Sequence, residues 1–103
     1  MIVRVFTGRV VGGREGDFNA NVRGRLDDIR QQPGNVYVKF ARKIEGDREL
    51  VMLITEWRTA ADLYAWTGDD VGTPKMVDLD MLEDWKVEHW EALDLTPLSD
   101  SPL

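Results

Sequence analysis

The segment "LVMLITEW", residues 50–57, is apolar at almost every position. Side chains of a β-strand alternate between the two faces of a sheet, so such a strand is buried on both faces. The preceding segment "NVYVKFARKI" alternates, with Val36, Val38, Phe40 and Ile44 on one face and Tyr37, Lys39, Ala41 and Lys43 on the other. The connection "EGDRE" through Gly46 joins the two segments as a β-hairpin.

Two segments have helical periodicity instead. Between Asp17 and Gln32 the apolar residues recur at steps of four, four and three, as Phe18, Val22, Leu26 and Ile29 do, and Pro33–Gly34 ends the pattern. A second, shorter helix begins at Thr59, whose side chain forms a capping box with Asp62, and ends at Gly68. We expect a first strand in "IVRVFTGRVV", one helical turn around residues 77–82 and a last strand in "WKVEHWEAL".

The resulting order, β-α-β-β-α-β, predicts an α+β fold of the ferredoxin-like type, with a four-stranded antiparallel sheet and helices on one face. The other face also carries apolar residues and needs a cover. We therefore predict a homodimer in which two sheets pack face to face about a two-fold axis. We predict one domain over residues 1–93, followed by a C-terminal tail at 94–103 that is rich in Pro and Ser.

Charge is distributed unevenly along the chain. Residues 1–58 contain eleven Lys and Arg against eight Asp and Glu, whereas residues 59–103 contain two against eleven, and the net charge is -6. A negative field repels phosphate, so we expect no nucleic-acid partner. The chain has no cysteine, no membrane-length apolar run and no signal-peptide pattern at its first residues, from which we expect a cytoplasmic protein without a membrane partner.

The stretch "PGNVYVKFARKIEGDRELVMLITEWRTAADLYAW" resembles the antibiotic biosynthesis monooxygenase (ABM) domain family of the dimeric α/β-barrel superfamily. The Pro-Gly pair, the hairpin, the strand-ending Trp57 and the Thr-capped helix follow in the order seen in that family. The resemblance implies the dimeric ferredoxin-like fold. The chemistry of the superfamily is varied, because its members include cofactor-free oxidases of quinols and anthrones, haem-degrading enzymes, isomerases and proteins without known activity.

The haem-degrading branch uses an Asn on the first strand, a Trp on the second helix and a His about ten residues later. Trp66 matches the Trp, but Met76 occupies the His position, and the first strand has no Asn. Without an imidazole the iron lacks its proximal ligand, so haem turnover is disfavoured, and we expect no metal site and no cofactor. A haem-binding protein is therefore the third and last of our interpretations of the function.

The cofactor-free branch needs only an apolar pocket, a base or hydrogen-bond acceptor, and little water. We interpret the protein as a cofactor-independent monooxygenase acting on a small aromatic or quinol-type substrate; the alternative is a non-catalytic small-molecule-binding or structural dimer. The candidate catalytic residues are His89 and Trp66, although a lone strand His is more often structural and Trp66 could equally plug the core. The candidate substrate contacts are Tyr64, Phe18, Val22, Phe6 or Arg4, and Arg42.

Overall fold

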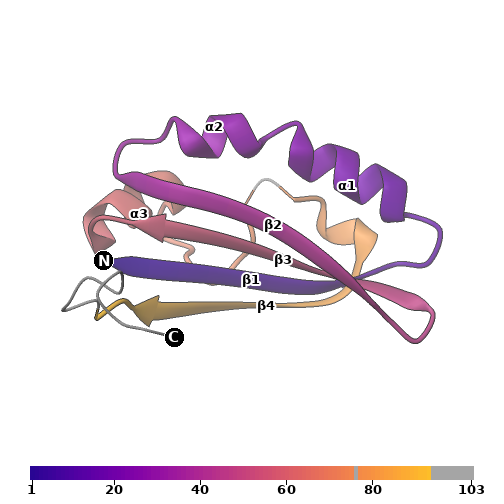
Figure 1. Ribbon diagram of the computed structural model, residues 1–103. Coiled ribbons are helices and arrows are strands. Elements are labelled where there is room, and N and C mark those ends of the chain that lie inside the picture. The colour runs from indigo at the N-terminus through magenta and orange to yellow at the C-terminus, as the bar shows by residue number, and fades with distance from the viewer. Residues whose placement is uncertain (76, 94–103) are drawn as a thin grey trace, which may run out of the picture.

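The computed structural model describes residues 1–75 and 77–93; the predicted tail at 94–103 and Met76 lie outside the described residues. The elements follow the order β1 (Ile2–Val10), α1 (Glu15–Arg23), α2 (Leu26–Arg30), β2 (Asn35–Glu45), β3 (Arg48–Trp57), α3 (Ala60–Thr67), a 3₁₀ turn (Leu79–Met81) and β4 (Leu82–Glu91). The four strands form one antiparallel sheet in the order β2-β3-β1-β4. In Figure 1, α1 and α2 run above the strands and α3 lies behind them. The α+β ferredoxin-like fold predicted from the sequence is confirmed.

The helical segment after β1 differs from the prediction. One continuous helix over residues 17–32 is wrong, because the chain forms α1 and α2 with a break at Gly24–Arg25. Glycine is a weak helix former, and here the Arg25 N–H bonds to the Val22 carbonyl only three residues back, which tightens the turn and redirects the chain. The predicted apolar stripe faces the core in spite of the break, because Phe18, Val22 and Ile29 are all buried.

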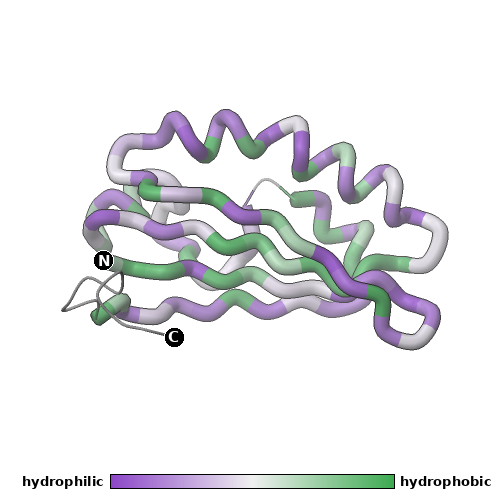
Figure 2. The backbone as a smooth tube through the Cα atoms, viewed as in Figure 1, coloured by the Kyte–Doolittle hydropathy of each residue, from purple (hydrophilic) through white to green (hydrophobic). Residues whose placement is uncertain are grey.

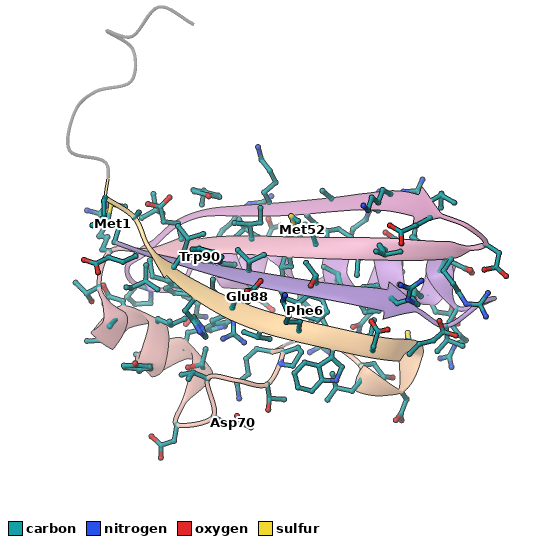
Figure 3. All side chains as sticks on the ribbon, turned by 90° about the horizontal axis from the view of Figure 1, so that it is seen from below. Met1, Phe6, Met52, Asp70, Glu88 and Trp90 are labelled. Carbon is teal, nitrogen blue, oxygen red and sulfur yellow. The ribbon has the colours of Figure 1, made fainter. Side chains whose placement is uncertain are left out.

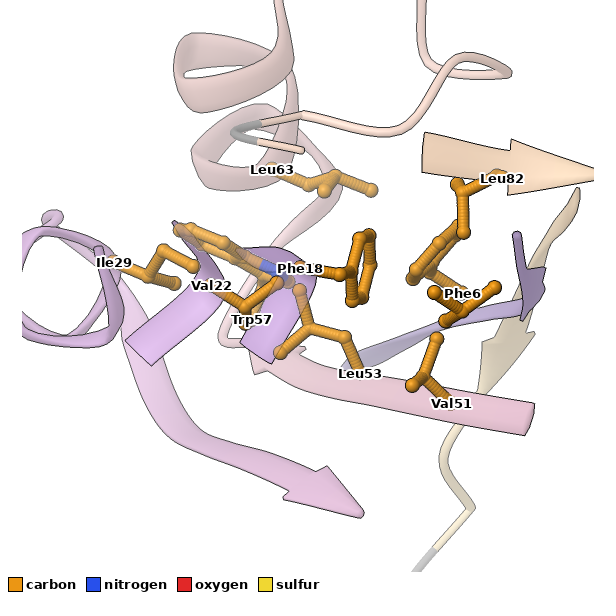
Figure 4. Close-up of a cluster of buried hydrophobic side chains, with 10 residues drawn as sticks. Phe6, Phe18, Val22, Ile29, Val51, Leu53, Trp57, Leu63 and Leu82 are labelled. Carbon is orange, nitrogen blue, oxygen red and sulfur yellow. The ribbon is translucent and has the colours of Figure 1, made fainter. Parts of the chain in front are cut away.

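The core lies between the helices and one face of the sheet. Burial along β1 alternates, with Arg4, Phe6 and Val10 turned toward the helices. Figure 4 shows the apolar side chains of this layer meeting those of β3 and the helices, with Trp57 fully buried among them. The cluster contains Phe6, Val10, Phe18, Val22, Ile29, Val51, Leu53, Trp57, Leu63 and Leu82.

The opposite face of the sheet has no helix over it. Figure 2 shows apolar residues along β1 and β3, and Figure 3 views the sheet from its helix-free side, with Met52, Glu88 and Trp90 labelled. Met52 on β3 is 38% exposed and Trp90 on β4 is 59% exposed. In the single chain β3 is therefore not buried on both faces, contrary to the prediction from the sequence. No helix in the described residues is long and apolar enough to cross a membrane.

Candidate functional site

The site lies where β1 and β4 pass beneath α3 and the segment 69–75 that follows it. The helix is fixed at its start by the Thr59 side chain, which accepts a hydrogen bond of 3.0 Å from the Asp62 N–H. At its end Gly68 takes φ = 74°, a conformation that glycine adopts without a Cβ penalty. The chain then turns back toward the sheet and brings residues 71–75 over Arg4.

Arg4 is the centre of the site, although it is a cation at an inward position of β1. It is only 3% exposed. Its Nη1 donates to the Val71 carbonyl oxygen at 2.6 Å and to His89 Nε2 at 2.9 Å, and its Nη2 donates to the Thr73 carbonyl oxygen at 2.8 Å. None of the ion pairs within residues 1–75 and 77–93 involves Arg4, so its direct hydrogen-bond partners are all uncharged groups.

Burial lowers the pKa of Arg4 to about 10, and the negative charge of Asp70 opposes that shift. The guanidinium therefore stays charged at neutral pH. His89 faces Arg4 in the β1–β4 register. Its pKa lies below the ordinary value of 6.5, first because of burial and second because of the nearby Arg4 charge. At neutral pH the site thus holds a permanent cation beside a neutral imidazole.

Trp66 joins this site to the core. Its ring stacks on Trp57 with centroids 5.0 Å apart and an interplanar angle of 22°. The Arg4 guanidinium lies over the Trp66 ring at 5.6 Å from the centroid, within cation–π distance. Trp57 is held in turn by a 3.0 Å hydrogen bond from its Nε1 to Thr55 Oγ1. The position of Trp66 is therefore fixed by Trp57 in the core and by Arg4 in the site.

Two hollows adjoin the Arg4–His89 pair. The first has a volume of about 140 Å³ and lies under α3, lined by Ile2, Ala60, Leu63, Tyr64, Val71 and His89. The second, at Trp66, has only about 10 Å³ and is lined by Arg4, Phe6, Leu53, Thr55, Trp66, Pro74 and Lys75. Arg4 stands between them, because it lines the second and bonds to two residues that line the first. Trp66 and His89 are thus brought close, but they do not share one continuous pocket.

The other predicted substrate contacts fall in four places. Tyr64 lines the hollow under α3, and Phe6 lines the small hollow beside Arg4. Phe18 and Val22 are buried in the core. Arg42 lies toward the hairpin end of β2, where its Nη1 donates to the buried Glu49 carboxylate at 2.6 Å, a group that also accepts from Asn19 at 3.0 Å.

Sequence reasoning named Arg4 only as an alternative to Phe6 and did not predict its central place. A signal for it exists in the alternation of the first strand, because Arg4 interrupts an inward series that otherwise contains Ile2, Phe6, Gly8 and Val10. A charged residue at an inward position is rarely placed there without a partner or a function.

No group of three His, Asp or Glu side chains in the described part of the chain is placed to hold a metal ion. The residue at the haem-ligand position of the haem-degrading branch is Met76, which lies outside the described residues. His89 is the chain's single histidine, and on β4 it bonds to Arg4.

The fold is shared with solved structures over nearly the whole chain. A candidate antibiotic biosynthesis monooxygenase from Nitrosomonas europaea superposes with a TM-score of 0.70 at 19% identity, covering 90% of this chain and 99% of that one. A candidate antibiotic biosynthesis monooxygenase from Deinococcus radiodurans gives a TM-score of 0.70 at 14% identity, covering 89% and 92%. MhuD, a haem degrader from Mycobacterium tuberculosis solved with two haems in its active site, gives 0.67 at 14% identity, covering 90% and 96%.

At these identities the structures establish the fold alone. Comparison of the sequence with curated proteins gives no significant match. The family model for antibiotic biosynthesis monooxygenase matches residues 1–71, which span β1 through α3 and so include Arg4, Tyr64 and Trp66. The chain therefore belongs to the antibiotic biosynthesis monooxygenase family.

Proposed function

We propose that the protein is a cofactor-independent monooxygenase that acts on a small aromatic or quinol-type substrate bound under α3. The observation that carries this proposal is a largely apolar hollow of about 140 Å³ whose wall includes His89, beside the buried Arg4. A cavity of about 150 Å³ is large enough to hold benzene, so the hollow matches one aromatic ring. Family membership supports the class of chemistry but not the substrate.

The reaction needs no cofactor, because an ionised phenol or anthrone can itself supply electrons to dioxygen. For a single-ring phenol, the carbon para to the hydroxyl gains one oxygen atom as a carbonyl, while that carbon and the hydroxyl each lose one hydrogen. The second oxygen atom of O₂ leaves as water with those two hydrogens, so atoms and electrons balance. The protein then has three tasks: to bind the ring, to stabilise the ionised oxygen and to exclude bulk water.

Each residue of the site has a place in this scheme. Leu63 and Tyr64 form the side of the hollow on α3, and Val71 closes it from the segment 69–75. His89 supplies the polar group that faces the ring's oxygen. The Trp66 ring packs against the Arg4 guanidinium. We assign no substrate contact to Arg42, because its side chain is hydrogen-bonded to Glu49.

The proposal is tested by dioxygen consumption with metal-free protein against a panel of hydroquinones, naphthols and anthrones. We expect at least one ring class to give uptake above the buffer rate that is lost in His89→Phe and retained in Arg9→Gln. Arg9 lies on β1 but pairs with Asp84 on the helix-free face, so it is a matched control. Uptake equal to the buffer rate across the panel would contradict the proposal.

The second candidate is a non-catalytic ligand-binding or structural dimer. The observation in its favour is the filled interior at Trp66, where only about 10 Å³ remains beside Arg4. The same panel of ring compounds distinguishes the monooxygenase from the non-catalytic dimer, because quenching of tryptophan fluorescence without oxygen uptake indicates binding alone. Haem binding, the third candidate, is tested by titrating haem into the protein and recording the Soret band.

We also propose that the protein is a homodimer whose helix-free faces pack together. Support comes from the register, which places Lys39, Ile54, Val5 and Glu88 in one row across this face. A two-fold axis parallel to the strands sets the β2 edge of one chain over the β4 edge of its partner. Each basic end of the row then lies over an acidic end, and the apolar middle is covered.

A further inference from the structure

Arg4 is a buried cation whose hydrogen bonds use only part of its donor capacity. A guanidinium has five N–H donors and no acceptor. Three of them are taken by Val71, Thr73 and His89. All three acceptors are uncharged, so within residues 1–75 and 77–93 this buried cation has no carboxylate in contact. A buried, unpaired cation favours an anion nearby.

The contact with Arg4 also fixes the proton on His89. Because Arg4 can only donate, the Nε2 atom at 2.9 Å from Nη1 must be the acceptor and carries no hydrogen. The neutral imidazole must then carry its hydrogen on Nδ1, so its free nitrogen is a donor. Protonation of Nε2 would place its N–H against the N–H of Arg4 Nη1. The imidazole therefore cannot accept a proton at Nε2 without breaking its hydrogen bond with Arg4.

The position of His89 connects this donor to the hollow under α3. His89 and Val71 both line the 140 Å³ hollow, and both accept hydrogen bonds from Arg4 Nη1. The guanidinium thus stands directly behind the wall of the hollow. The other ionisable groups around the pair are Tyr64 in that wall, Lys75 at the small hollow and Asp70, whose carboxylate accepts a 2.6 Å hydrogen bond from Thr73 Oγ1.

We propose that Arg4 holds His89 as the Nδ1–H tautomer, so that His89 donates a hydrogen bond to the ionised hydroxyl of an aromatic substrate in the hollow under α3. The inference rests on the proposed function for the class of substrate. His89 acts as a donor to the anion and not as a general base, and the hydroxyl proton is released to solvent water. Arg4 is a positioning residue that acts through His89 and adds its charge behind it.

The test uses 4-nitrophenol, whose phenolate absorbs at longer wavelength than the phenol, and 4-nitroanisole, its methyl ether, which cannot ionise. We expect wild-type protein to bind the phenolate and to shift the ionisation of the bound phenol to lower pH. Loss of a hydrogen bond to a charged group should weaken phenolate binding roughly tenfold to a hundredfold in His89→Phe and Arg4→Gln. Binding of 4-nitroanisole should change little in these variants, and Arg9→Gln should resemble wild type.

Arg4→Lys and the wild-type imidazole spectrum keep the test decisive if Arg4→Gln fails to fold. Arg4→Lys should retain part of the phenolate preference, and ¹⁵N chemical shifts should show hydrogen on Nδ1 of His89. Equal affinity for both probes, no phenolate binding, or hydrogen on Nε2 would each overturn the inference. Binding of both probes is measured without dioxygen, so neither can be oxidised. Phenolate preference without oxygen uptake in the separate assay would refute only the monooxygenase, and uptake without that preference would refute only this inference.

Discussion

At the scale of single residues, Trp66 belongs both to the core and to the site. Its ring stacks on the fully buried Trp57 and supports Arg4. We expect Trp66→Ala to cost about 2 kcal/mol in urea unfolding, less than the ~3–5 kcal/mol of Trp57→Ala, because Trp66 is only partly buried. The same change should weaken the quenching of Trp fluorescence by naphthoquinones, because it removes the tryptophan that packs against Arg4. A large loss of stability with unchanged quenching would make Trp66 a core residue alone.

His89 gives a second residue-scale prediction, which is simple to measure because the chain has one histidine. Its native pKa is lowered, so the unfolded chain binds the proton more tightly and stability is lost as pH falls below about 6.5. An NMR titration should place the native pKa below 6.5, and Arg4→Gln should raise it. The unfolding free energy of His89→Gln should fall less steeply between pH 7 and 5 than that of wild type. Equal slopes would remove His89 from the pH dependence.

At the scale of elements, the turn between α2 and β2 holds α3 in place. Gly34 has φ = 81°, and its carbonyl accepts from the Arg58 N–H at 2.9 Å. A Cβ added at Gly34 would overlap the Asp62 side chain at the start of α3. Gly34→Ala should therefore destabilise the protein by about 2 kcal/mol and weaken ligand binding under α3.

Gly46→Ala is the matched control, since Gly46 also has a positive φ of 64° but nothing lies within 4 Å of its added Cβ. It should cost only about 1 kcal/mol, the strain of the left-handed conformation itself. Thermal unfolding of both variants measures the difference. Equal losses would show that the contact of Gly34 with α3 contributes nothing.

The elements were more predictable from the sequence than the site. The Thr59 cap and the Pro33–Gly34 stop depend on neighbouring residues, and both are present in the structure. Of the inward face predicted for β2, Val38 and Phe40 pack against the core, whereas Val36 and Ile44 are exposed. The break at Gly24 was not predicted, because the apolar stripe continues across it. The Arg4–His89 contact joins residues 85 positions apart, and it follows from strand order, which periodicity alone does not reveal.

At the scale of the whole molecule, charge and apolar surface share the helix-free face. Lys39 and Lys43 stand on the β2 edge of this face and Glu88 on its β4 edge, whereas Arg42 is turned to Glu49. Lys39→Glu/Lys43→Glu should weaken dimerisation at low salt, and mixing with Glu88→Lys should restore it in part. Each single pair contributes only ~0.2–1 kcal/mol, so both lysines are reversed together.

Sedimentation velocity at nanomolar to micromolar protein measures this effect. Arg23→Glu/Arg25→Glu makes the same change in net charge in the helical layer and should leave the dimer intact. A charge-reversed β2 variant that stays dimeric at low salt, without preference for Glu88→Lys, would assign the association to apolar packing alone. A monomeric wild type would contradict the homodimer itself.

The monooxygenase assignment is tested most directly by the fate of the oxygen atoms. Metal-free protein is incubated under ¹⁸O₂ with the ring substrate that gives the highest uptake, and the product is analysed by mass spectrometry. The account predicts one ¹⁸O atom in the product carbonyl, the other in water, and loss of the label in His89→Phe but not in Arg9→Gln. Product without ¹⁸O, or equal labelling with and without protein, would contradict it.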